Sequence, residues 1–174
     1  MYCSALTTAD FPVATSIGNS AFYSCSALTT ADFPAATSIG NCAFQSCSAL
    51  TTVSFPSVTN IGNSTFAYCT SLTTVSFPSV TSIGNCAFQN CSALTTADFP
   101  AVTSIGANVF YDCSALTSLI LASTSMASCG ISIFNNASNA IAYVNDALVS
   151  DYKAATNWSQ YASRIKGISE LPSE

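Results

Sequence analysis

The stretch CSALTTADFPVATSIGNSAFYS, residues 3–24, is the unit from which most of this 174-residue chain is built. It recurs every 22 residues, starting at Cys25, Cys47, Cys69 and Cys91. A sixth copy opens at Cys113 and then diverges. Each full copy keeps the frame C-x-x-L-T-T-x-x-F-P followed by T-x-I-G. Because a single coil of this length cannot bury its apolar side chains alone, such a period predicts a stacked solenoid.

Alternation within the first copy predicts a short strand. Ala9 and Phe11 point to one side of an extended segment, while Thr8 and Asp10 point to the other. Pro12 ends the strand because it has no N–H to donate to a neighbouring strand. We therefore expect an inward side that joins the core and an outward polar side.

The rest of the unit predicts how each coil closes. Ile17 and Gly18 form a second short extended stretch, and Gly18 permits a turn with positive φ. The SAF-x-x-C segment is expected to be a tight helical turn that returns Phe22 and the next Cys to the interior. The core columns are headed by Leu6, Phe11, Ile17 and Phe22. The asparagines that follow the glycines are expected at turns, bonded to their neighbours across coils; they are Asn19, Asn41, Asn63 and Asn85.

The recurring residues F-x-x-C-x-x-L-T-x-x-x-F-P-x-x-x-x-x-I-G-x-x-x-F resemble the BspA-type leucine-rich repeats of bacterial and some protozoan surface proteins. The segment at 140–168 is similar to the carboxy-terminal region of such gut-bacterial proteins. The resemblance implies an α/β leucine-rich-repeat solenoid with short strands and tight helical turns. It also implies export to the cell surface or beyond, and a role in adhesion or in binding. Members usually carry a longer array and a secretion signal, whereas this chain starts within a repeat.

Composition divides the chain into two parts. Residues 1–113 hold five repeats, in an array that we interpret as truncated or uncapped at its start. Residues 114–174, which contain the only Trp and all three basic residues, are expected to form the divergent last repeat and a mixed α/β cap. In this cap we expect a strand over 140–144 and a helix over 147–155 capped by Asp146. Trp158 and Tyr161 are interpreted as a lid over the last repeat, with a sugar-stacking platform as the alternative.

The charge balance narrows the function classes. Charged residues make up 6% of the chain and the net charge is −5, so nucleic acid and anionic membranes are unfavourable partners. No apolar run approaches the roughly 18 residues of a membrane span. Histidine, the commonest general base, is absent. Ser150 to Lys153 matches S-x-x-K without its companion motifs. We expect no enzyme activity and no cofactor.

The nine cysteines are interpreted as structural. Six belong to one repeat column, so their spacing reflects duplication, and no histidine accompanies them in a zinc-binding pattern. Column neighbours in stacked coils lie about 5 Å apart, within disulfide reach. An odd number of cysteines with equivalent neighbours nevertheless disfavours a defined disulfide framework. We expect a ladder of buried thiols, most of them free.

The outward side of the strands is the candidate binding face. It joins a threonine column to a column of Asp and Ser, and solenoids commonly bind partners on such extended sheets. The expected partner is a protein or glycan on a host or neighbouring cell. The candidate residues are Thr8, Asp10, Thr30, Asp32, Thr52, Ser54, Thr74, Ser76, Thr96 and Asp98.

Other interpretations of this face remain open. Asp10 and Asp32 would lie near the carboxylate separation of retaining glycosidases, but both face open solvent. A calcium ion between them would be weakly held, because no carbonyl cage accompanies the pair. The ladders also resemble ice-binding arrays, although Asp and Ser interrupt the threonine lattice. The rival to recognition is a spacer that holds another domain away from the cell.

The first repeat predicts self-association. Its apolar end and open strand edge lack a neighbouring coil, so we expect a second copy to pair there and form a homodimer. Light scattering across micromolar concentrations should therefore report twice the mass of one chain. A monomer throughout that range would contradict the prediction.

Overall fold

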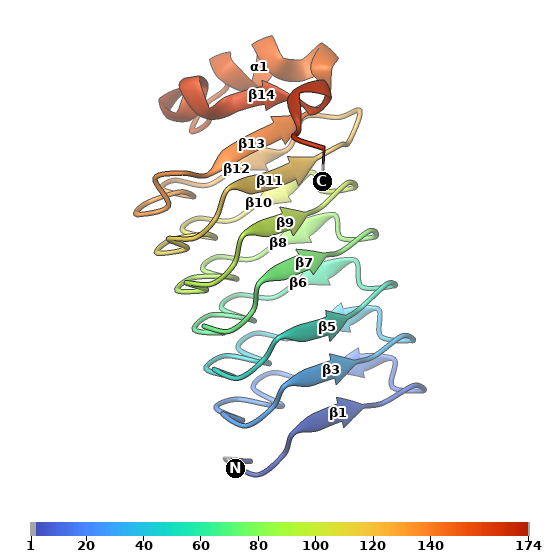
Figure 1. The fold of residues 1–174 in the computed structure, drawn as a ribbon. Helices are drawn as coiled ribbons and strands as arrows, with labels where there is room; N and C mark the ends of the chain where they lie inside the picture. Colours follow the sequence, from blue (N-terminus) through green and yellow to red (C-terminus); the bar gives the residue numbers. More distant parts are fainter. Residues whose placement is uncertain (1–2, 174) are drawn as a thin grey trace.

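The computed structural model describes residues 3–173, which wind into a solenoid of stacked coils (Figure 1). Each coil crosses a front and a back row of parallel strands. The front strands are β1 (Thr8–Asp10), β3 (Thr30–Asp32), β5 (Thr52–Ser54), β7 (Thr74–Ser76), β9 (Thr96–Asp98), β11 (Ser118–Leu121), β13 (Ile141–Val144) and β14 (Ile165–Gly167). The back strands are β2 (Ser16–Ile17), β4 (Ser38–Ile39), β6 (Asn60–Ile61), β8 (Ser82–Ile83), β10 (Ser104–Ile105) and β12 (Ser128–Cys129).

The strand register places each residue of the array beside the residue 22 positions later. Thr8 pairs with Thr30 and Ala9 with Ala31 on the front, and Ile17 pairs with Ile39 on the back. The back strands form one sheet of six, in which β2 and β12 lie at the edges. Identical side chains therefore stack on one another, and each position of the unit becomes a column.

Two columns of phenylalanine rings fill the interior. Rings of the column that begins at Phe11 stack with centroids 5.2 to 5.9 Å apart as far as Phe99. Rings of the column from Phe22 to Phe110 stack at 5.1 to 5.7 Å. Each fully buried ring contributes about 2 kcal/mol by leaving water. In the first coil Phe11 is still 45% exposed, because no coil within residues 3–173 covers that side of it.

The segment that closes each coil is a run of turns, so the expected helical turn is wrong. Two residues in each run have φ between 53° and 63°, as at Ser20 and Ser24, and this left-handed conformation prevents a helix. It also aims alternate N–H groups at the next coil: Ser20 N donates to Asn41 O at 2.9 Å and Phe22 N to Ala43 O at 2.8 Å. The array is thus a β-solenoid with a third hydrogen-bonded ladder, and the helices within 3–173 lie in the cap.

The glycine column serves close packing, whereas the sequence predicted a positive φ. None of the glycines has a positive φ. A Cβ atom on Gly84 would lie 2.7 Å from the backbone N and the Oδ1 of Asn63 in the preceding coil. The same asparagine Oδ1 accepts a hydrogen bond from Asn85 N at 2.8 Å. The predicted bonding of asparagines across coils is confirmed, and glycine is required because the asparagine occupies the space of a side chain.

A cap covers the last coils. It contains η1 (Asp146–Leu148), α1 (Val149–Ala154), η2 (Ser159–Arg164) and η3 (Ile168–Glu170), and β14 lies beyond β13 as the final strand. Asn145, and not Asp146, caps the first of these helices: its Oδ1 accepts from Ala147 N at 3.1 Å. Trp158 is fully buried and donates from Nε1 to Ala127 O at 2.8 Å. It is a lid, as predicted, and its ring offers no platform to a sugar.

The glycine packing predicts a matched pair of variants. Gly84→Ala should lower the free energy of unfolding by about 1–3 kcal/mol, because its methyl group overpacks the space held by Asn63. Gly18→Ala should be neutral or slightly stabilising, since no atom lies within 4 Å of its Cβ position. Guanidinium unfolding followed by circular dichroism measures both. Equal losses in the two variants would refute a packing role.

Candidate functional site

The ten candidate residues all lie on the outward side of the front strands, which we call the front face. Thr8, Thr30 and Thr52 are in register in one row. Asp10, Asp32 and Ser54 are in register in the other. The same two rows resume at β7 and β9, where Ser76 Oγ donates to Asp98 Oδ2 at 3.1 Å. The inward residues between the rows are alanine or valine and belong to the core.

The front face is interrupted once, between β5 and β7. These two strands belong to separate sheets, although the back strands β6 and β8 of the same coils remain paired. Val53 and Val75 are adjacent inward residues in a column that is alanine in the other three full repeats. The neighbouring ring centroids of Phe55 and Phe77 are 5.9 Å apart, the widest spacing in their column. The break in the front sheet thus coincides with the two coils that carry valine in this column.

Asp10 and Asp32 face open surroundings. Asp10 is exposed and Asp32 is half-buried, and the two are in register on neighbouring strands. Within residues 3–173 no three His, Cys, Asp or Glu side chains lie close enough together to hold a metal ion. Neither carboxylate lies in the enclosed apolar pocket in which a glycoside hydrolase holds its general acid.

The cysteine column forms a hydrogen-bonded ladder of thiols. Cys69 Sγ donates to Phe44 O at 3.2 Å, and Cys91 Sγ donates to Phe66 O at 3.1 Å. Burial is the main cause that raises the pKa of both thiols well above the ordinary range. Burial likewise raises the pKa of Cys113 to about 12. All nine cysteines are free thiols in the structure, which confirms the predicted ladder.

A groove of about 400 Å³ lies at the end of the front face near the cap. Its hydroxyl-bearing part comes from the starts of β9 and β11, and its apolar part comes from β11 and from the chain after η3. The lining residues are Thr96, Thr117, Ser118, Ile120, Leu171 and Pro172. Of these, only Thr96 was a candidate from the sequence. The groove could not be predicted because residues 171–172 have no counterpart in the repeat.

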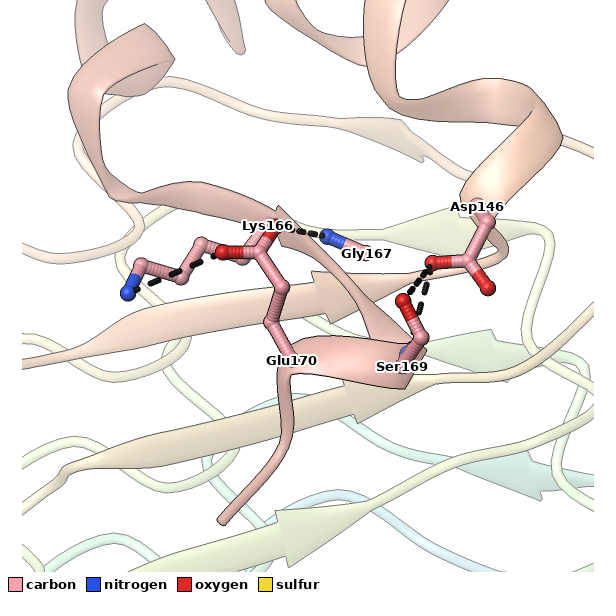
Figure 2. Close-up of polar contacts among 5 residues, drawn as sticks. All are labelled: Asp146, Lys166, Gly167, Ser169 and Glu170. Carbon is pink, nitrogen blue, oxygen red and sulfur yellow. Dashed lines mark hydrogen bonds and ion pairs between the residues drawn. The ribbon is translucent and has the colours of Figure 1, made fainter.

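A polar cluster holds this carboxy-terminal tail in place (Figure 2). Asp146 Oδ1 accepts hydrogen bonds from Ser169 Oγ at 2.9 Å and from Ser169 N at 3.3 Å. Glu170 Oε1 accepts from Gly167 N at 3.2 Å, and Glu170 Oε2 lies 3.9 Å from Lys166 Nζ. Tyr143 on β13, although in register with the outward Ile120, is only 3% exposed. These contacts hold the segment 166–170 in place, and β13 beside the groove is buried at Tyr143.

Asp98 lies on the front face beside the groove. It is in register with Ile120, which lines the groove, and it follows Thr96 by two residues on the same side of β9. Its carboxylate is half-buried, and this burial raises its pKa while the hydrogen bond from Ser76 partly opposes the shift. The sequence identified this residue but gave no sign of its distinct surroundings.

A second hollow, of about 210 Å³, lies at the opposite end of the solenoid. It is lined mainly by apolar side chains of the first coil, including Phe11, Ile17 and Phe22. Val13, close to it in the chain, is 86% exposed. Among residues 3–173, no helix has the length and apolar character needed to cross a membrane.

Comparison with known proteins agrees with the repeat pattern. The sequence profile of the family described as "BspA type Leucine rich repeat region" matches residues 1–117 and 59–147, with six copies. No curated protein matches the chain significantly.

Three solved structures share the fold. A leucine rich cell surface protein from Faecalibacterium prausnitzii A2-165 is 24% identical with a TM-score of 0.54, covering 93% of this chain and 36% of that protein. The Leucine Rich Repeat protein of T. pallidum is 19% identical with a TM-score of 0.57, covering 87% and 78%. A leucine-rich repeat protein from Bacteroides ovatus ATCC 8483 is 23% identical with a TM-score of 0.53, covering 82% and 49%. This chain thus spans about a third of the first protein and half of the third.

The thiol ladder predicts a clear difference between native and unfolded labelling. At pH 8 iodoacetamide should modify at most Cys3, Cys42 and Cys86, which are partly exposed. The other six are buried, and burial raises their pKa, so they react only after unfolding. Mass spectrometry without reductant should then find nine modified cysteines. Three or four intact disulfides, or fast native labelling of Cys69, would contradict the ladder.

Proposed function

Because the chain belongs to the BspA-type leucine-rich repeat family, we propose that it is a non-enzymatic binding protein displayed at the cell surface or secreted. Its front face recognises a protein or a glycan of a host or neighbouring cell. The cell-surface description of the Faecalibacterium protein, which shares the fold, supports this location.

The observation that carries the proposal is that two adjacent threonine columns have different roles, one in bonding between coils and one at the outward surface. Thr29 Oγ1 donates to Thr7 O at 2.9 Å, and Thr95 Oγ1 donates to Thr73 O at 3.0 Å, so this column ties neighbouring coils together. The next residues along the chain, such as Thr30 and Thr96, point outward. Within residues 3–173 the hydroxyls of this outward column make no hydrogen bond to the protein. They remain available to a ligand.

The rigidity of the face favours recognition as well. The ladder of the back strands and the ladder of the closing turns run through successive coils, and the front ladder holds the outward side chains in register on either side of the break between β5 and β7. A ligand that binds such a preordered surface does not have to order it first, which lowers the entropic cost of binding. The groove beside Thr96 gives this surface a distinct feature, which a simple spacer does not require.

Self-association at the other end is a separate proposal. The apolar hollow around Phe11 and Phe22 would be covered if a second copy packed against the first coil.

Paired arginine substitutions test the binding face. Thr52→Arg with Thr74→Arg places two long cations on exposed front positions, whereas Ser38→Arg with Ser104→Arg places them on exposed back positions. A glycan array and a panel of purified extracellular proteins supply the first ligand, and biolayer interferometry measures its Kd. We expect at least tenfold weaker binding for the front variant and less than twofold for the back variant.

Two outcomes would contradict the proposal. Equal weakening by the front and back variants would remove the front face as the site. If no component of the array or the panel binds the unaltered protein, the spacer alternative is favoured instead.

A further inference from the structure

We propose that the groove beside β9 and β11 binds an extended peptide segment of a partner protein, with a lysine or arginine of that segment reaching the carboxylate of Asp98. This inference rests on the proposed function and names the partner chemistry for one part of the front face.

The shape and lining of the groove fit a peptide. Thr96, Thr117 and Ser118 supply hydroxyl groups, and Ile120, Leu171 and Pro172 supply apolar surface. None of the lining residues is aromatic, and the nearby Tyr143 is buried, so no flat ring is available to stack on a sugar. A peptide can use both kinds of surface, because its backbone groups bond to hydroxyls while its side chains pack on apolar walls.

The carboxy-terminal tail of the chain borders the groove. After η3 the backbone at Leu171 is extended, with φ −62° and ψ 127°, and Leu171 and Pro172 form one wall of the groove. Figure 1 shows this tail leaving β14 and passing in front of the neighbouring strands. The remaining groove lies alongside it, between the tail and the hydroxyls of β9 and β11. An extended peptide in the groove would therefore contact hydroxyl groups on one side and Leu171 and Pro172 on the other.

The negative charge of Asp98 favours a basic side chain in the bound peptide. Asp98 is half-buried and takes a hydrogen bond from Ser76, but none of residues 3–173 forms an ion pair with it. The three basic residues lie in the cap. Lys166 approaches Glu170, Arg164 donates to Ala137 O and stacks over Tyr161, and Lys153 is on α1.

A partly desolvated carboxylate without a counter-ion is stabilised by an incoming cation. A lysine or arginine can pack its methylene stem on Ile120 and extend its charged end to Asp98. The carboxylate has acceptor positions left for this contact after the single bond from Ser76.

The probe is an array of capped heptapeptides with randomised flanking residues and a central arginine, lysine, citrulline or glutamate. Citrulline keeps the shape of arginine and removes its charge. Peptides with central arginine or lysine should bind at least tenfold more strongly than those with citrulline, and glutamate should abolish binding. Fluorescence anisotropy on the best arginine peptide and its citrulline counterpart then gives both Kd values.

Two variants locate the contact. Asp98→Asn should weaken binding of the arginine peptide at least tenfold and remove the preference over citrulline. Asp151→Asn, the control that removes an exposed carboxylate on α1 away from the front face and the groove, should change the Kd less than twofold. Circular dichroism verifies that both variants fold.

The remaining outcomes overturn the inference, and they distinguish its failure from failure of the proposed function. Equal binding of arginine and citrulline peptides, or unchanged binding by Asp98→Asn, removes the basic-peptide site. If a glycan or another protein still binds and is lost in the front arginine variant, the proposed function survives without it. If nothing binds the front face, both fail.

Discussion

The register of 22 residues between successive coils is the constraint on which the rest of this structure depends. Once Thr8 pairs with Thr30, every other position of the unit must also meet its own copy. The unit is therefore restricted to residues that tolerate their own kind at close range. Phenylalanine rings stack, thiols donate to backbone oxygens, and asparagine amides bond to the next asparagine. Charged residues are scarce in the array because a column of like charges would repel itself.

Hydrogen bonding between coils explains why the closing segment is not helical. A helix would satisfy its N–H groups internally, whereas these coils direct alternate N–H groups to the next coil. The left-handed residues at Tyr68 and Cys86 carry a conformational cost of about 1–2 kcal/mol each. The bonds that they allow recur at every coil and offset that cost. Local propensity alone favoured a helical turn, and tertiary pairing overrode it.

The features that distinguish one part of the front face from another arise where the repetition is incomplete. The regular columns give the front face a uniform surface, which is interrupted between β5 and β7, where the inward residue changes from alanine to valine. The groove appears only where Ile120 replaces the Asp or Ser of the repeat and the tail crosses the sheet. Asp98 is the last acidic residue of its row, and so it alone borders apolar surface instead of another polar side chain on that side. Identical T-A-D strands thus differ in chemistry because their neighbours differ.

The sequence by itself determined the solenoid, the inward and outward columns, the free thiol ladder and the buried lid at Trp158. The first three follow from periodicity, because a repeated residue has one environment in every coil, whereas the lid follows from the need to cover the last coil. The tertiary structure decided the features that depend on contacts between dissimilar segments. Asn145 took the role assigned to Asp146 because the Asp146 carboxylate bonds to Ser169, far along the chain. The glycines leave room for the asparagine of the preceding coil, and the groove depends on the position of Leu171. Both are contacts between segments that a single 22-residue unit does not contain.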